Sequence, residues 1–267
     1  MTSSRRRAAG SRRGVGAGTP RRLSTDSFRG GPRRTMRNHV ITQGWSMPPP
    51  PPARDQVAGY DLDGVVTRRD SFTALLVDRL RASPPRLIRA FPSLLRLTLH
   101  PGDAQRRSRA ARRVTEVALS GLSTPEYQRL ADEVGARIGG DPTWLRAEVV
   151  DRIRREHGAG TRVVVATASE HRLATALLRA ADIPFDLLSA SRLTGGPTGQ
   201  RVADHRVGAR KAEALRECGV PLDEAVFTTD SYTDLPAARL AARVVLVGAT
   251  RRTRERYAAA GIDVRAR

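Results

Sequence analysis

The chain has 267 residues, of which 39% are hydrophobic and 28% are charged, and its formal net charge at pH 7 is +20. This composition suits a folded globular protein and argues against a wholly disordered chain. No run of about 18 uncharged apolar residues occurs, so we expect no membrane-spanning helix. Because Cys218 is the only cysteine, an internal disulfide is excluded, which fits a reducing cytoplasm.

The positive charge is concentrated at the N-terminal end. Residues 1–53 carry eleven arginines and a single acid, Asp26, and Arg, Gly and Ser dominate until five consecutive prolines follow. We predict a disordered, basic and Pro-rich tail over residues 1–54. Such a tail could bind nucleic acid non-specifically. A solvated tail, or a true start at Met36 or Met47, explains the same charge run more simply.

Short apolar segments alternate with amphipathic segments after the tail. Helical periodicity is clear over residues 171–180 and 209–218. The strand candidates, in chain order, are residues 57–60, 163–166, 185–188, 225–227 and 244–247. This alternation predicts an α/β fold, with a Rossmann-like parallel sheet flanked by helices. We expect residues 55–70 and 158–267 to form this core.

The interval between the first two strands contains helical patterns and no convincing strand. We predict a helix over residues 104–119, a second helix that begins with Thr124 as its capping residue, and a third over residues 144–156. Another apolar helical face is formed by Leu87, Phe91, Leu94, Leu95 and Leu99. These helices predict an all-helical cap, residues 71–157, inserted after the first strand. Ligands of open α/β sheets bind beyond the C-terminal strand ends, so this cap would cover the site.

The first cluster with chemical potential, Asp61-Leu62-Asp63-Gly64, follows the first predicted strand. Two carboxylates at this spacing can point to the same side of the chain, and Gly64 permits a sharp turn after them. One carboxylate can attack an electrophile while the other handles a proton. A calcium loop is excluded, because the next four residues supply none of the further acids that such a loop requires.

Three further clusters lie near the ends of later strands. Residues 167–169 read Thr-Ala-Ser and suit an oxyanion, although a plain helix cap at Ser169 is the simpler interpretation. Asp230 and Asp234 follow the fourth strand, and their oxygens suit a hard cation. Lys211 precedes that strand and is the only lysine in the chain, beside 46 arginines. Because the chain uses arginine for its other basic side chains, the single lysine suggests that position 211 requires a compact ammonium group.

Taken together and in order, these clusters resemble the four signature motifs of the haloacid dehalogenase superfamily. The motif residues are Asp61, Asp63, Gly64, Thr167, Lys211, Asp230 and Asp234. The helical insertion, the segment 230–236 and the Gly-rich segment 193–196 resemble subfamily IB, the phosphoserine phosphatase-like branch. The resemblance covers residues 56–250. Val65 and Thr229 depart from it, since the family usually has Thr and Gly there.

The resemblance implies a Mg²⁺-dependent phosphomonoester hydrolase that acts through an aspartyl-phosphate intermediate. Asp61 would be the nucleophile, Asp63 the general acid and base, and Lys211 would offset the negative charge. The substrate phosphate would be held by Thr167, Ala168, Lys211 and Gly64. The metal would be held by Asp61, Asp63 through its backbone carbonyl, Asp230 and Asp234. The substrate would be a small phosphorylated metabolite, similar to phosphoserine, or a lipid headgroup phosphate.

The cap sequence leaves the substrate and the partners open. Residues 79–113 carry ten arginines and one acid, which favours an anionic substrate or surface. The apolar face within residues 87–99 could lie on a membrane, although packing inside a helix bundle is the commoner use of such a face. An alternative function is a catalytically weak binding protein that uses the tail and cap on nucleic acid or an anionic membrane. Phosphotransfer to an acceptor other than water also stays open.

Overall fold

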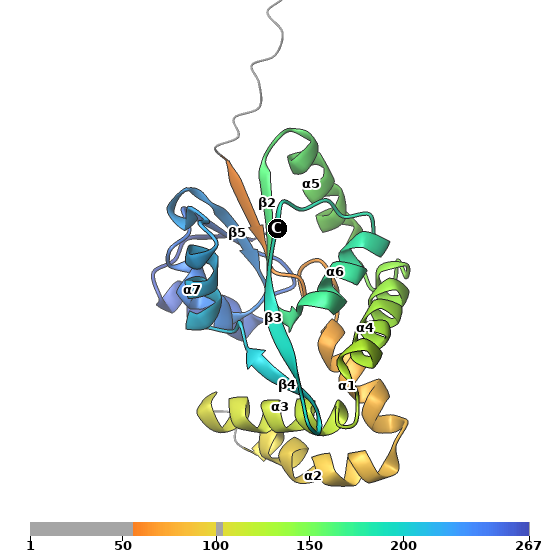
Figure 1. The fold of residues 1–267 in the computed structure, drawn as a ribbon. Helices are drawn as coiled ribbons and strands as arrows, with labels where there is room; N and C mark the ends of the chain where they lie inside the picture. Colours follow the sequence, from red (N-terminus) through yellow and green to blue (C-terminus); the bar gives the residue numbers. More distant parts are fainter. Residues whose placement is uncertain (1–55, 100–103, 267) are drawn as a thin grey trace, which may run out of the picture. The chain divides into compact units, whose positions relative to one another are not determined.

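The computed structural model describes residues 56–99 and 104–266, so the predicted tail over residues 1–54 lies outside the described residues. The strands are β1 Val57–Tyr60, β2 Arg162–Glu170, β3 Leu187–Gly196, β4 Gly199–Asp204, β5 Val226–Thr229, β6 Arg243–Leu246 and β7 Val264–Ala266. They form one sheet in the order β4-β3-β2-β1-β5-β6-β7 (Figure 1). Every pairing is parallel except that of β3 with β4. The predicted α/β fold with a Rossmann-like parallel sheet is confirmed.

Helices surround the sheet and fill the interval between β1 and β2. In that interval lie α1 Ser71–Arg81, α2 Pro84–Leu99, α3 Ala104–Ala118, α4 Thr124–Gly139 and α5 Ala147–Gly158. The later helices are α6 His171–Ala180, α7 Ala209–Glu217, α8 Leu235–Ala238 and α9 Arg251–Ala259, with short 3-10 turns at Leu222–Glu224 and Tyr232–Asp234. Within the described ranges, none of these helices has the length and apolar character needed to cross a membrane.

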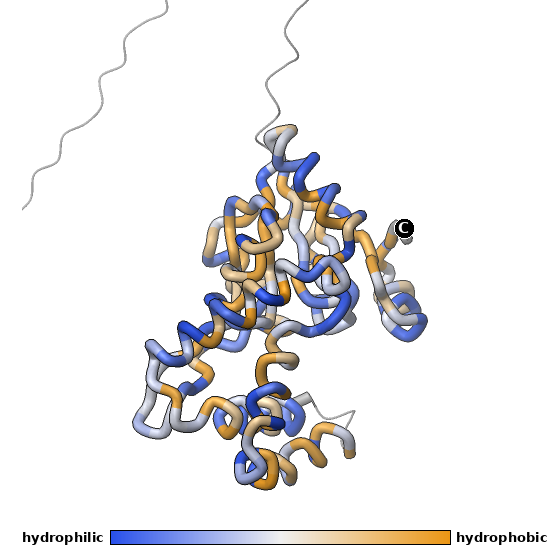
Figure 2. The backbone as a smooth tube through the Cα atoms, turned by 90° about the vertical axis from the view of Figure 1, so that its right-hand side faces the viewer, coloured by the Kyte–Doolittle hydropathy of each residue, from blue (hydrophilic) through white to orange (hydrophobic). Residues whose placement is uncertain are grey.

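The centre of the sheet is buried on both faces, as its sequence predicts. Val163, Val164 and Val165 of β2 are each at most 1% exposed. Figure 2 shows hydrophobic segments that run through the body of the molecule. Tyr60, the last residue of β1, pairs with Val165 of β2 and Thr228 of β5. Because these strands are parallel and in register, the segments that follow them emerge at one edge of the sheet.

The sequence did not predict β4 or β7, and the third strand is longer than the predicted residues 185–188. β3 continues past the parallel sheet into an antiparallel hairpin with β4, closed between Gly196 and Gly199. The outer half of β3 is largely solvent-accessible and polar, so it lacks the unbroken apolar run that identified the buried strands. Gly199 has a φ of +123°, which other residues rarely adopt.

Two helix starts differ from their predictions by a few residues. The N-cap of α4 is Ser123 and not Thr124, because the Ser123 hydroxyl accepts from the Glu126 amide while the Glu126 carboxylate accepts from the Ser123 amide. The helix predicted over residues 144–156 begins at Ala147. Its start is delayed because the amide of Arg146 donates to the carbonyl of Val66, which joins this segment to the turn after β1.

The expectation that the apolar face of α2 packs inside a helix bundle is wrong for four of its five residues, whereas Leu94 is partly buried and packs against the core. Leu87, Phe91, Leu95 and Leu99 are between 41% and 63% exposed, and Ile88 is 73% exposed. The inner face of α2 is built around the small buried side chains Ala90 and Ser93, and α2 packs against α3. Small residues let the two helices approach closely, so the large apolar side chains are left on the outside.

By contrast, α4 is fixed tightly to α6 of the core. A Cβ atom added to Gly135 would lie 2.6 Å from Ala176 Cβ and 2.8 Å from the Leu173 carbonyl oxygen. Next to this contact, the Arg172 guanidinium donates two hydrogen bonds to the Asp132 carboxylate. The backbones of the two helices therefore meet directly, and any side chain at residue 135 would separate them.

We therefore predict that Gly135→Ala destabilises the fold by about 1–3 kcal/mol, because the added methyl group overpacks a backbone contact. Urea denaturation followed by circular dichroism measures this change. Gly158→Ala is the matched control: Gly158 is also a helical glycine, but a Cβ atom there meets nothing within 4 Å. That control should be neutral or stabilising. Equal stability of the Gly135→Ala variant and the unchanged protein would contradict the prediction.

Candidate active site

The turn after β1 places Asp61 at the carboxyl edge of the sheet. The Asp61 amide donates to the Thr228 carbonyl of the neighbouring β5 at 2.9 Å, and Asp61 Oδ1 accepts from the Leu62 amide at 2.8 Å. Gly64 completes the turn with a φ of +83°, and a Cβ atom there would lie 2.1 Å from Asp230 Oδ2. Gly64 is therefore needed both for its backbone conformation and for the approach of the Asp230 carboxylate.

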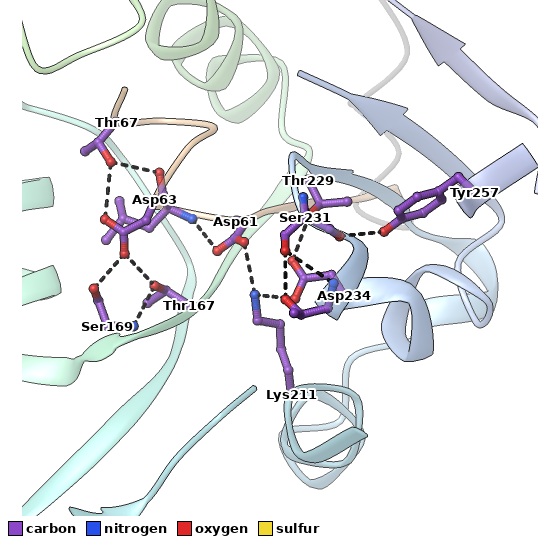
Figure 3. Close-up of polar contacts among 12 residues, drawn as sticks. Asp61, Asp63, Thr67, Thr167, Ser169, Lys211, Thr229, Ser231, Asp234 and Tyr257 are labelled. Atoms are coloured by element: carbon purple, nitrogen blue, oxygen red, sulfur yellow. Dashed lines mark hydrogen bonds and ion pairs between the residues drawn. The ribbon is translucent and has the colours of Figure 1, made fainter. Parts of the chain in front are cut away.

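Lys211 lies between two carboxylates that come from different parts of the sheet (Figure 3). Its Nζ is 3.1 Å from Asp61 Oδ2 and 2.7 Å from Asp234 Oδ1, and the side chain is only 2% exposed. Although burial alone would lower the pKa of Lys211, the charges of Asp234 and Asp61 raise it above its ordinary value. Lys211 is therefore a cation held in place by two acids.

Asp63 turns away from Lys211 toward the ends of β2 and α1. Its Oδ2 accepts from the Ser169 hydroxyl at 2.6 Å and from the Thr167 hydroxyl at 3.4 Å. Its Oδ1 accepts from the Ser71 amide at 2.8 Å and from the Thr67 hydroxyl at 3.3 Å. Four donors thus fix the orientation of the carboxyl group within reach of the same cavity as Asp61.

One of these donors, Ser169, shows what sequence reasoning missed. Ser169 is not a helix cap, because Glu170 is the N-cap of α6 and accepts from the Arg172 and Leu173 amides. The Ser169 hydroxyl is therefore available to Asp63, 106 residues away in the chain. Spacing alone could not reveal this pairing, although a second hydroxyl two residues after Thr167 was the available signal.

Thr229, which departs from the usual glycine, also has a defined role in the geometry. Its hydroxyl donates to Asp234 Oδ2 at 2.8 Å and accepts from the Ser231 amide at 3.1 Å. The other oxygen of Asp234 faces Lys211, so this fully buried carboxylate lies behind the ammonium group. Tyr257 of α9 supports the same loop by donating to the Ser231 carbonyl.

Seven of the eight residues singled out in the sequence line one cavity of about 370 Å³. They are Asp61, Asp63, Gly64, Thr167, Ala168, Lys211 and Asp230. Asp234 is the exception and reaches the cavity only through Lys211. Arg68 and Arg69 also line the cavity, and Arg146 supports its floor by donating to the Gly64 carbonyl at 3.1 Å. None of these three arginines was identified from the sequence.

The cavity carries an excess of negative charge. Burial raises the pKa of Asp61 well above its ordinary value; Lys211 opposes this rise, and Asp234 and Asp63 add to it. Burial and the Asp234 carboxylate raise the pKa of Asp230 to about 6. Burial, followed by the charge of Asp70, also raises the pKa of Asp63 against the hydrogen bonds from Ser169 and Ser71. Arg68 and Arg69, which also line the cavity, are exposed, so Lys211 is the buried cation that faces these acids, and one ammonium group does not balance them.

The donor set fits a hard divalent cation. Mg²⁺ prefers one or two protein carboxylates together with water and substrate phosphate, and Asp61 and Asp230 both line the cavity. A cation there would relieve the repulsion that raises the pKa values of these acids. In the described parts of the chain, no three His, Cys, Asp or Glu side chains surround a single metal position, so the protein does not offer a cage of side chains alone.

Comparisons with known proteins agree with this geometry. Among solved structures, a Bordetella pertussis Tohama I protein of unknown function is 20% identical, with a TM-score of 0.53 over 78% of this chain and 97% of that one. A probable phosphoserine phosphatase from Vibrio cholerae is 14% identical, with a TM-score of 0.53 over 77% and 60%. A phosphoserine phosphatase from T. onnurineus is 16% identical, with a TM-score of 0.51 over 82% and 92%.

At these identities the structural matches establish a shared fold, and no curated protein sequence matches the chain. The family itself is shown by a sequence model, described as haloacid dehalogenase-like hydrolase, that matches residues 58–239. This match begins within β1 and ends just after α8, so it contains every residue of the cavity described above. The chain belongs to the haloacid dehalogenase-like hydrolase family.

Proposed function

We propose that the protein is a Mg²⁺-dependent phosphomonoester hydrolase that acts through an aspartyl-phosphate on Asp61. The observation that carries this proposal is the buried contact of Lys211 with both Asp61 and Asp234 at the edge of the cavity. An ammonium group in that position favours the charged, nucleophilic form of Asp61 and opposes the rise in its pKa that burial causes. Solved phosphoserine phosphatases with the same fold support a phosphatase activity.

In the first step, an Asp61 carboxylate oxygen attacks phosphorus and the bond from phosphorus to the ester oxygen breaks. The Asp63 carboxyl group gives its proton to the departing oxygen, so the alcohol leaves neutral. The raised pKa of Asp63 supports its protonation before this step. Thr167, the backbone beside Ala168 and Gly64, and Lys211 hold the phosphoryl oxygens, since all four line the cavity.

In the second step, the Asp63 carboxylate takes a proton from water, whose oxygen attacks phosphorus. The bond between Asp61 and phosphorus breaks, inorganic phosphate leaves, and both carboxyl groups return to their initial states. Bound Mg²⁺ would neutralise charge on the phosphoryl oxygens and would be held by Asp61, Asp230 and the Asp63 backbone carbonyl. Asp234, predicted as a further metal residue, would act by positioning Lys211 and the loop that carries Asp230.

This mechanism predicts that Asp61→Asn lowers kcat for an aryl phosphate by at least about 1,000-fold, because the amide is not a nucleophile. Asp230→Asn should raise the Mg²⁺ concentration needed for half-maximal activity, and calorimetry with Mg²⁺ alone should show weaker binding. Asp78→Asn is the matched control, since Asp78 forms only an exposed ion pair with Arg137. Metal-independent hydrolysis, or full activity of Asp61→Asn, would contradict the mechanism.

The alternative, a binding protein with little catalysis, predicts no hydrolysis of any phosphate ester with or without Mg²⁺.

Contact with an anionic membrane is part of this alternative, but it is compatible with an enzyme as well. Five of the six exposed large apolar side chains in the described ranges lie on α2, and Ile88, Phe91, Leu95 and Leu99 share one side of that helix. We infer that this side lies on the surface of an anionic bilayer.

The positive charge of α2 and α3 also supports contact with an anionic bilayer. A hollow of about 350 Å³ between α2 and α3 is lined by four arginines, namely Arg96, Arg106, Arg109 and Arg113. Apolar side chains beside guanidinium groups suit acyl chains beside anionic headgroups.

Vesicle co-sedimentation tests this contact. The protein should bind vesicles that contain phosphatidylglycerol and bind phosphatidylcholine vesicles poorly, and Ile88→Asp should lower the binding by about tenfold or more. Ala258→Asp on α9 is the matched control for charge, because Ala258 is exposed and lies outside α2. Equal binding of both variants, or binding that ignores the anionic lipid, would contradict a role for the α2 side chains.

A further inference from the structure

A second cavity, of about 280 Å³, lies between the inserted helices and the β3–β4 hairpin. Eleven of its nineteen lining residues are apolar, and they come from four places in the fold. From α1 come Phe72, Leu76, Val77 and Leu80; from α2, Leu94 and Leu97; from α3, Ala111 and Val114; and from the core, Ala168, Leu193 and Val202. We call this the apolar pocket.

The apolar pocket adjoins the candidate active site. Asp70 and Ala168 line both cavities, and Ser169, which donates to the Asp63 carboxylate, lines the apolar pocket. The proposed proton donor to the departing oxygen therefore lies at the junction. A phosphate held beside Asp61 would direct its ester group past Asp63, and the neighbouring space on that side is the apolar pocket.

The pocket also has charged lining residues, namely Asp70, Arg112 and Glu170. The Asp70 carboxylate accepts from the Thr73 amide as the N-cap of α1. One oxygen of Glu170 accepts from the Tyr127 hydroxyl and from two amides of α6. Burial, then repulsion from Arg112, lowers the pKa of His205, so this imidazole is neutral at neutral pH. The carboxylates of Asp70 and Glu170 thus already accept hydrogen bonds from the protein, and Arg112 is exposed, so the apolar side chains form the larger part of the pocket lining.

We propose that the substrate is a phosphate monoester of an apolar alcohol, whose hydrocarbon chain occupies the apolar pocket during hydrolysis. This inference rests on the proposed function, because it places the phosphate beside Asp61. The pocket volume equals that of roughly nine liquid water molecules at 30 Å³ each, which suits a single medium-length alkyl chain. The shared chemistry is an alkyl phosphate, from either a soluble ester or a membrane lipid.

Hydrolysis of a series of n-alkyl phosphates tests the proposal, with all esters kept below their micelle concentrations. From ethyl to hexyl phosphate, kcat/KM should rise about fourfold per methylene group, as expected for burial of each group in an apolar site. The kcat/KM for propyl phosphate should exceed that for O-phospho-L-serine, which has the same number of carbon atoms and two added charges. A flat series, or preference for phosphoserine, would overturn the proposal even if the Mg²⁺-dependent hydrolysis itself is found.

A pair of variants on one helix locates the effect. Leu97 is half-buried and lines the apolar pocket, whereas Leu95 is 45% exposed and points elsewhere. Leu97→Gln should reduce the ratio of hexyl to ethyl phosphate kcat/KM by about tenfold, because it places an amide in the apolar pocket. Leu95→Gln should keep that ratio. A reduction of the same size in both variants would overturn the assignment of the pocket.

Two further arms separate the remaining outcomes. If dilauroyl phosphatidate in vesicles is hydrolysed while the soluble series is flat, the surface and not the pocket selects the substrate, and the proposal fails. If no ester is hydrolysed at all, the proposed function fails, and binding to Asp61→Asn decides the pocket separately. In that variant hexyl phosphate should bind at least about 30-fold more tightly than ethyl phosphate; equal affinities would overturn the pocket.

Discussion

The buried ammonium group of Lys211 is the interaction on which the site depends. A charge with 2% exposure is stable in a protein only when opposite charges accompany it, and here Asp61 and Asp234 do so. These residues come from the end of β1, from α7 and from the turn after β5, so one ion cluster fixes three segments of the fold. A guanidinium group is larger and planar, which explains why the only lysine in an arginine-rich chain occurs at this position.

The sheet makes this cluster possible. Parallel strands in register bring Asp61, Thr167 and Asp230 to one edge, although Asp61 is more than 100 residues away from the other two in the chain. The insertion between β1 and β2 then divides into two parts with different attachments. Packing of Gly135 against α6 holds α4 on the core, while α2 and α3 pack against each other and against α1. The apolar pocket is lined by α1, α2, α3 and the core together, and the exposed apolar side belongs to α2. In the proposed function, the chemistry and the selection of the ester group would therefore take place in two adjoining cavities.

The sequence was sufficient for the fold class and for seven of the residues that line the cavity, because strand periodicity and short motifs are local patterns. Features that depend on distant contacts were out of its reach. The Ser169 hydroxyl looked like a helix cap until Glu170 proved to be the N-cap, and Arg146 contacts the site only through tertiary structure. The exposure of Phe91 and its neighbours also could not be predicted, since the same helical pattern describes a face that is buried and a face that is not.

The proposed mechanism depends on phosphorylation of Asp61 while Lys211 balances its charge. Mass spectrometry of the protein, quenched in acid during turnover of an aryl phosphate with Mg²⁺, tests it most directly. We expect a phosphate group on the peptide that contains Asp61. This phosphate group should be absent without substrate and in the Asp61→Asn variant. Steady hydrolysis with no phosphate on that peptide, or with phosphate on another residue, would contradict a mechanism through an aspartyl-phosphate on Asp61.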